Sequence, residues 1–388
     1  MSSTEIFALR KKGQTAQALE MARVEYPANA EDLWFLRAYG WALYDHARKL
    51  VDAYETNQLS PSVLSGKFSP YMREFARMAN TLRGDTTFSQ MLRLAGKVSK
   101  DWDEFLGFAR WAGTQDFSEE DKKPFVNESG KTIDSLQKRF IRAICREVAV
   151  RANDSQLDNS LRDWGCGVLQ DALEREPNDQ WLNYYQGKLH LANGEVDLAV
   201  RRLAPVLRRQ SRASWPWALL GEVFESTRPD AALICFAHAV QLAREEQEVA
   251  KVRIRLAQRL ALEGRFGEAA QQAHLALQYR EKHGYRIPNE LQQLLSSDWY
   301  KQALTENGLQ TLPKVESDAR TLLQELDRQN LSYVTGVVDH INNEKALSYV
   351  ATSTNAGVAL THRKFPEMAQ LPPGTLVEIG RADPEGPP

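Results

Sequence analysis

Residue types that support catalysis are present, but not in spacings that make a catalytic site. The seven histidines stand singly, and none has a second ligand at the spacing of a zinc motif such as His-Glu-x-x-His. Gly130, Lys131 and Thr132 look like the end of a phosphate-binding loop, but Phe125 replaces the earlier glycine that this loop requires. No serine or cysteine stands in a nucleophile elbow. The sequence therefore predicts no enzymatic activity, no metal and no cofactor.

The densest group of side chains suited to ligand binding is a run of arginines: Arg201, Arg202, Arg208, Arg209 and Arg212. No acidic residue occurs between Leu198 and Gly221, and Trp215 and Trp217 follow the arginines closely. Guanidinium groups bind phosphates or carboxylates, so this run is a possible contact for nucleic acid or for an acidic protein. The alternative, which we favour, is a solvated convex face of a helical array.

Length and composition indicate a protein of two or three domains without a membrane segment. The chain has 388 residues, 43% of them hydrophobic, and carries 49 basic against 51 acidic side chains, a net charge of -2. This balance gives no general sign of nucleic-acid or membrane binding. Cys145, Cys166 and Cys235 lie in apolar helical patterns and are expected to be packed, reduced thiols. With no signal peptide and no long apolar run, we expect a cytoplasmic protein.

Internal repetition is the strongest organising signal. Gly187 and Gly221 lie 34 residues apart, which is the period of a tetratricopeptide helix-turn-helix unit. The clearest unit has Trp217, Leu220, Gly221 and Phe224 in its first helix and Ala232, Phe236 and Ala239 in its second. The following unit has Leu256, Ala257, Leu260, Gly264, Ala269, Ala273 and Ala276. Small residues let the paired helices approach and large residues fill the space between units, so the pattern resembles the tetratricopeptide family.

The predicted fold is mostly α: a tetratricopeptide-like helical solenoid followed by a small C-terminal β-barrel. Tetratricopeptide-like helices are expected over residues 1–60, an irregular helical region over 61–156 with a loop near 115–134, the main array over 157–300 and linking helices over 301–330. From residue 331 to 388, short β-branched segments separated by Asn, Gly and Pro predict strands.

The tetratricopeptide resemblance implies a groove lined by the first helix of each unit. The residues that it places there are Asn183, Gln186, His190, Trp215, Glu222, Lys251, Arg255 and Gln258. Lys251 and Arg255 occupy positions that hold a partner's acidic C-terminus in carboxylate-clamp arrays, but Leu182 and Leu219 replace two polar residues of that clamp. The expected ligand is therefore an acidic or amphipathic segment of a protein partner, and the alternative is ordinary solvated charge.

The β segment resembles a cold-shock domain, a five-stranded barrel of the oligonucleotide-binding (OB) fold. Gly336, Val338, Leu371, Gly374 and Val377 carry the resemblance. It implies nucleic-acid contacts from His340, Lys345, Tyr349 and His362, since these barrels stack bases on aromatic rings.

Several positions depart from the cold-shock pattern. Ile341, Leu347 and Leu360 stand where the family has aromatic residues. Residues 331–388 also hold four basic against six acidic side chains, the reverse of what phosphate binding requires. Nucleic-acid binding is possible here but not favoured over a structural or protein-docking role. The family's fifth strand would follow Gly386 and Pro387, so either the chain is part of a longer protein or an open barrel needs a partner strand.

The order of these regions resembles the tetratricopeptide proteins of prokaryotic TOTE-type conflict systems. This resemblance implies a scaffold or sensor subunit of a bacterial anti-phage system, with another component of the same system as the protein partner in the groove. The alternative is an RNA- or single-strand-DNA-binding regulator that uses the OB domain and the arginine run.

Overall fold

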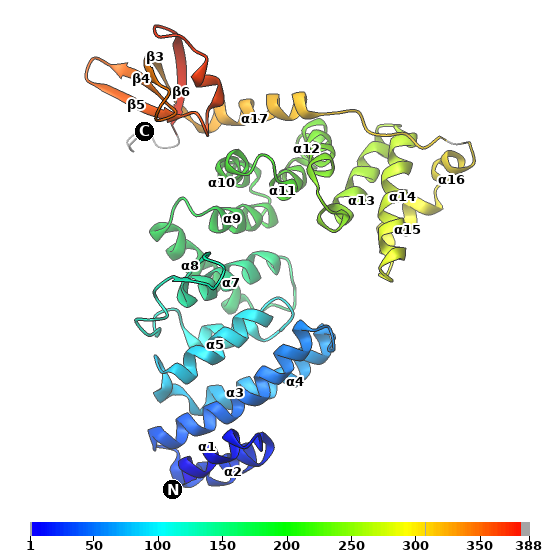
Figure 1. Cartoon of the computed structure of the whole chain (residues 1–388). Helices are drawn as coiled ribbons and strands as arrows, with labels where there is room; N and C mark the ends of the chain where they lie inside the picture. Colours follow the sequence, from blue (N-terminus) through cyan, green and yellow to red (C-terminus); the bar gives the residue numbers. More distant parts are fainter. Residues whose placement is uncertain (1, 307, 382–388) are drawn as a thin grey trace. The chain divides into compact units, whose positions relative to one another are not determined.

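The computed structural model describes residues 2–306 and 308–381, and within them the chain is mostly helical with a small sheet near its C-terminal end (Figure 1). The predicted fold class is confirmed in both parts, except that the sheet is not closed. Contacts divide the chain into two compact units, residues 1–192 and 193–388. This division falls within the stretch 157–300 that the sequence treats as one array.

Nine α-helices form the described part of the first unit. They are α1 (Ser2–Lys11), α2 (Thr15–Asn29), α3 (Leu33–Glu55), α4 (Pro61–Met78), α5 (Thr86–Val98), α6 (Phe105–Ala112), α7 (Leu136–Val150), α8 (Asn159–Arg175) and α9 (Gln180–Ala192). Fully buried phenylalanines such as Phe35, Phe68 and Phe140 fill one core that extends from α1 to α7. Burial of aromatic area at this density is the main force that orders the irregular helical region.

The loop expected near residues 115–134 contains local structure. A two-residue hairpin pairs β1 (Phe125–Val126) with β2 (Thr132–Ile133), and Gly130 takes the positive φ of 74° that its turn requires. Asp121 is buried beneath the loop and accepts hydrogen bonds from the Ser118 and Ser89 hydroxyls. Gly130, Lys131 and Thr132 therefore belong to a surface hairpin and not to the strand-to-helix turn of a phosphate loop.

The second unit begins with helical hairpins. Its helices are α10 (Val196–Arg209), α11 (Ser214–Phe224), α12 (Pro229–Leu242), α13 (Glu246–Leu262), α14 (Phe266–Lys282), α15 (Asn289–Ser296), α16 (Asp298–Thr305) and α17 (Glu316–Asn330). Gly221 of α11 faces Phe236 of α12 so closely that a Cβ atom on Gly221 would lie 2.5 Å from the ring. Ala257, Ala269 and Ala273 are fully buried between α13 and α14. These hairpins pack in the tetratricopeptide manner that the small-residue pattern predicts.

Helix α17 returns to pack along α10 and α12 (Figure 1). Its Ala319, Leu322 and Leu326 are buried, at the spacing of one helical face. Two ion pairs flank this face: Arg208 to Asp327 at 2.6 Å and Arg228 to Glu325 at 3.0 Å. The sequence predicts α17 as a linking helix, and the structure shows that it also covers part of the array.

The C-terminal sheet is antiparallel, with the strand order β5-β4-β3-β6. Its strands are β3 (Ser332–Asn342), β4 (Leu347–Ser353), β5 (Ala356–Thr361) and β6 (Leu376–Arg381). Val338, Val350, Val358 and Met368 form the small core on one face. Within the described residues β5 and β6 each pair with only one neighbour, so the sheet is open and the expected barrel is not present. The stretch around Gly386 and Pro387, expected to precede a fifth strand, lies outside the described residues.

Candidate partner-binding groove

A cationic cavity lies between α13, the end of α14 and the start of α15. Its volume is about 740 Å³. Nine residues line it: Lys251, Ile254, Arg255, Gln258, Arg280, Arg286, Pro288, Asn289 and Glu290. Four of these carry a positive charge and one, Glu290, carries a negative charge. The sequence places three of them, Lys251, Arg255 and Gln258, in the partner groove, and the structure brings these three together in one cavity.

The helical period explains why α13 presents its polar side chains to this cavity. Lys251, Arg255 and Gln258 are spaced at i, i+4 and i+7 and therefore share one face. Ala257 and Leu260 on another face are fully buried against the neighbouring helices. Packing of the apolar face thus fixes the rotation of α13 about its axis, and the polar face of α13 lines the cavity.

The cationic side chains of the cavity differ in how far they are already neutralised. Arg255 makes an ion pair with Glu225, and its Nε lies 4.0 Å from a carboxylate oxygen of Glu222. Lys251 and the side chain of Arg286 are exposed and make no hydrogen bond or ion pair within the described residues. Because an unpaired surface cation gains most from an incoming carboxylate, Lys251 and Arg286 are the strongest candidates for partner contacts.

Arg280 and Arg286 are groove residues that sequence reasoning did not identify. Arg280 lies in the last turn of a second helix, and its Nη1 donates a 2.8 Å hydrogen bond to the carbonyl oxygen of Arg286. Arg286 lies two residues after Gly284, which has a positive φ of 65°, and it lines the cavity together with Lys251 of α13. The Gly284 turn after a helix end was the available sequence signal, but the repeat frame assigns groove positions only to first helices.

The remaining predicted groove residues have other surroundings. Asn183, Gln186 and His190 lie on α9 in the first unit. The Asn183 side chain is 8% exposed and its Nδ2 donates to the carbonyl oxygens of Pro177 and Asp179 at 2.8 and 2.9 Å. This amide is committed to the turn before α9 and offers little to a partner. Gln186 and His190 hydrogen-bond each other across 3.1 Å.

In the second unit, Trp215 and Glu222 lie on α11. Trp215 is half-buried, and Glu222 faces Arg255 at 4.0 Å. Glu222 therefore acts within the chain as part of the acidic pair that neutralises Arg255. Trp215 and Glu222 do not line the cationic cavity.

The arginine run does not form one uniform patch. Arg201, Arg202, Arg208 and Arg209 lie on α10, and Arg212 lies in the turn that follows. The Arg208 guanidinium donates two hydrogen bonds to Asp327 of α17, at 2.9 and 2.6 Å. Arg208 is therefore neutralised by this chain and is not available as predicted for a phosphate.

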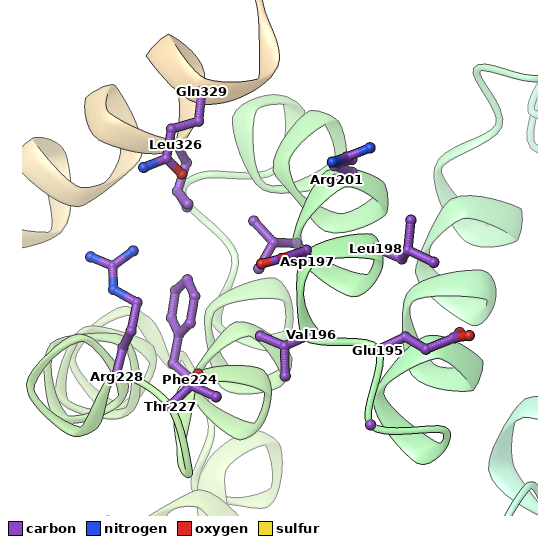
Figure 2. Close-up of a pocket in the computed structure, with 12 residues that line it drawn as sticks. Glu195, Val196, Asp197, Leu198, Arg201, Phe224, Thr227, Arg228, Leu326 and Gln329 are labelled. Carbon is purple, nitrogen blue, oxygen red and sulfur yellow. The ribbon is translucent and has the colours of Figure 1, made fainter.

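Arg201 lines a different cavity, of about 850 Å³, between α10, the α11–α12 turn and α17 (Figure 2). Figure 2 shows Glu195, Asp197 and Arg201 on one side of the opening, with Phe224 and Arg228 on the other. Arg228 is already paired with Glu325. Two acidic and two basic side chains leave this cavity without a dominant charge, so it does not select anions.

The predicted nucleic-acid residues of the sheet are partly engaged with one another. The rings of His340 and Tyr349 stack on each other, with centroids 4.3 Å apart and planes 17° from parallel. His340 also contacts Asp339 at 2.9 Å, and His362 contacts the Ser348 hydroxyl at 2.9 Å. Lys345 is exposed in the turn between β3 and β4. The structure brings His340 and Tyr349 together, but as a pair that competes with a base for the same ring faces.

Within residues 2–306 and 308–381, no group of three or more His, Cys, Asp or Glu residues is placed to hold a metal ion. No helix in the same ranges is both long and apolar enough to cross a membrane. Cys145, Cys166 and Cys235 are free thiols, and burial raises the pKa of Cys145 to about 12. Such a thiol stays protonated and unreactive at neutral pH.

A family model described as "Domain of unknown function (DUF7017)" matches residues 180–319, from α9 to the first turn of α17. No curated protein matches the sequence significantly. Among solved structures, the crystal structure of yeast Tom70 is similar to this chain, with 12% sequence identity and a TM-score of 0.31. The similarity covers 84% of this chain and 88% of Tom70.

Proposed function

We propose that this protein is a non-enzymatic scaffold that acts inside the cell and binds an acidic segment of a protein partner in the cavity between α13, α14 and α15. The observation that carries this proposal is the charge of the cavity, four cations against one carboxylate, with Lys251 and Arg286 unpaired. Carboxylate side chains of an extended segment would complete the ion pairs that the chain itself leaves open.

The resemblance to the tetratricopeptide proteins of TOTE-type conflict systems supports a more specific role. We propose that the scaffold is a sensor or assembly subunit of a bacterial anti-phage system and that its partner is another component of that system. The open sheet supplies a second contact with the partner. Within the described residues its edge strands, β5 and β6, each pair with a strand on one side only, which leaves backbone N–H and C=O groups on the other side for a partner strand.

The test is co-purification of the tagged full chain from its host, with nuclease treatment before elution. We compare the wild type with the charge-reversed variant K251E/R286E. The matched control is R244E/K282E, which reverses two exposed cations outside the cavity and gives the same net charge. A protein partner that survives nuclease, stays with the control and is lost from K251E/R286E supports the proposal. Equal recovery with all three proteins would overturn the assignment of this cavity.

A second candidate function, an RNA- or single-strand-DNA-binding regulator, is favoured by one observation. His340 of β3 and Lys345 of the turn that follows β3 are both exposed, so a base and a phosphate of one strand can reach them. Recovery of nucleic acid alone, with loss of all co-purifying protein after nuclease treatment, supports this candidate over the scaffold.

A further inference from the structure

A third cavity, of about 810 Å³, lies on α12 where the start of α17 and the segment before it cross that helix. One side is formed by Trp217, His238 and Leu242, and the other by Lys314, Arg320 and Leu323. It shares no lining residue with the groove between α13, α14 and α15 or with the cavity of Figure 2.

The floor of this cavity contains an unusual buried histidine. His238 is 8% exposed and packs edge-on against the Trp217 ring, with centroids 4.7 Å apart. Its Nδ1 is sealed from solvent and has no hydrogen-bond partner within the described residues, whereas Nε2 is not sealed in this way. Burial lowers the pKa of His238, so the ring is neutral at physiological pH.

The tautomer of His238 follows from this asymmetry. A neutral imidazole carries one proton, and a sealed N–H without an acceptor is costlier than a sealed lone pair. The proton therefore resides on Nε2, the nitrogen that keeps access to the cavity. His238 can donate one hydrogen bond to a ligand there.

The rim of the cavity is cationic, with one carboxylate. Arg212, Lys314 and Arg320 line it together with Glu316, which gives a net charge of +2. Lys314 and Arg212 make no ion pair within the described residues, and Arg320 meets Glu316 only at 3.4 Å with both side chains exposed. Such a rim attracts a dianion, and Glu316 can accept hydrogen bonds from hydroxyl groups.

The wall contributed by the linking segment is held in place by side-chain contacts. The Gln241 amide donates from Nε2 to the Pro313 carbonyl oxygen at 2.7 Å and accepts at Oε1 from the Val315 amide at 3.2 Å. These two bonds fix the backbone on both sides of Lys314. The cavity is therefore formed before any ligand arrives, which lowers the cost of binding.

We infer that this cavity binds a nucleoside monophosphate. The phosphate meets Arg212, Lys314 and Arg320, the ribose hydroxyls meet Glu316, and the base lies toward Leu242 and Leu323, where His238 donates to a base acceptor. The volume suits a ligand of this size. This site is separate from the partner groove, and the two proposals are tested independently.

Isothermal titration of the full chain with AMP, GMP, CMP and UMP, and with adenosine and inorganic phosphate, tests the inference. We expect at least one monophosphate to bind at one site per chain, at least tenfold more tightly than adenosine or phosphate. Absence of binding by all four monophosphates, or equal binding of phosphate alone, would overturn it.

Three variants connect the binding to this cavity. K314E/R320E is expected to weaken binding at least tenfold, whereas R328E, on the same helix but outside the cavity, leaves it unchanged. His238→Phe keeps the packing on Trp217 and removes the unpartnered Nδ1, so it is expected to preserve the melting temperature. It also removes the Nε2–H donor, so it is expected to weaken binding at least fivefold. Unchanged affinity in K314E/R320E and in His238→Phe contradicts the site.

Hydrogen exchange gives an independent readout. Because α17 forms one wall, the monophosphate that binds is expected to slow amide exchange over residues 316–330 in the wild type and not in K314E/R320E. Binding without any change in the amide exchange of α17 would also contradict this site.

Discussion

At the scale of single residues, the contact between Gly221 and Phe236 determines how closely the two helices of the hairpin, α11 and α12, approach each other. An alanine at Gly221 would place its Cβ 2.5 Å from the Phe236 ring, and both residues are in well-packed helices. The helices α11 and α12 would then have to separate, which loses contacts along the whole hairpin. A small side chain at this position is therefore a packing requirement.

Gly221→Ala is expected to lower the free energy of unfolding by about 1–3 kcal/mol, the range for an overpacked core site. Gly167→Ala is the control, because Gly167 lies within α8 and a Cβ there meets nothing within 4 Å. It should stabilise the protein by about 0.5–1 kcal/mol through helix propensity. Urea unfolding measures both, and a neutral Gly221→Ala variant would show that the hairpin contact is looser than described.

Also at the scale of single residues, Glu74 makes the stability of the fold sensitive to acid. Burial raises the pKa of Glu74, but hydrogen bonds from Arg23 and Tyr39 and the charge of Arg23 outweigh it, so the pKa lies below its usual value. Arg23 holds the carboxylate with two hydrogen bonds of 2.8 Å. Because the pKa of Glu74 is lower in the folded state than in the unfolded state, the ionised carboxylate stabilises the fold. This stabilisation is fully present at a pH above the unfolded-state pKa and is lost as the pH falls through the folded-state pKa.

We therefore expect Glu74→Gln to destabilise the protein at pH 7 and the difference from wild type to shrink as the pH falls below about 4. The measurement is thermal unfolding as a function of pH. Glu20→Gln, at an exposed position on α2, is the control and should follow the wild-type profile. A difference that stays constant down to pH 3 argues against the ion pair as its source.

At the scale of elements, α17 is attached by a narrow apolar face and two ion pairs. Ala319, Leu322 and Leu326 bury against the array, while Asp327 and Glu325 bind Arg208 and Arg228. Such an element has less apolar burial than the hairpins, so it is expected to open before them. The pairing also gives the acidic residues of α17 a specific register on α10 and α12.

Asp327→Arg places two cations side by side and is expected to speed amide exchange in α17 severalfold. The charge-swapped double variant R208D/D327R should recover much of the protection, because the pair is restored with reversed polarity. The individual effect is about 1 kcal/mol or less, since both side chains are partly exposed. If the double variant exchanges as fast as Asp327→Arg, the ion pair does not hold α17.

At the scale of the whole molecule, the charge balance decides how the protein meets nucleic acid. The chain carries a net charge of -2, and Arg208 is already bound to Asp327. Arg201, Arg202 and Arg212 make no hydrogen bond or ion pair within the described residues, but three cations release few counterions.

We expect no saturable binding of a 20-nucleotide single strand at low micromolar protein and physiological salt, measured by fluorescence anisotropy. At low salt, weak binding should appear. The binding constant should fall only gradually as salt is added, with a slope that corresponds to the release of about two to three counterions. Tight binding at physiological salt that is abolished in R201E/R202E/R212E would favour the nucleic-acid regulator instead.

The sequence by itself determined the helical hairpins, because a 34-residue spacing of small and large apolar residues is local information. Gly221, Ala257 and Ala273 lie where the repeat frame places them, and Lys251, Arg255 and Gln258 share one cavity because the helical period alone puts them on one face. The strands of the sheet were likewise predicted from β-branched segments between turn residues.

Only the tertiary structure decided which of these charges are free. Arg255 is neutralised by Glu225 thirty residues away, Arg208 by Asp327 far along the chain, and the amide of Asn183 by a turn. It also decided that the sheet stays open over the described residues, and that His238 lies beneath the segment leading into α17. Residue types set which interactions are possible, but long-range packing sets which partners meet, and no local pattern in the sequence contains that choice.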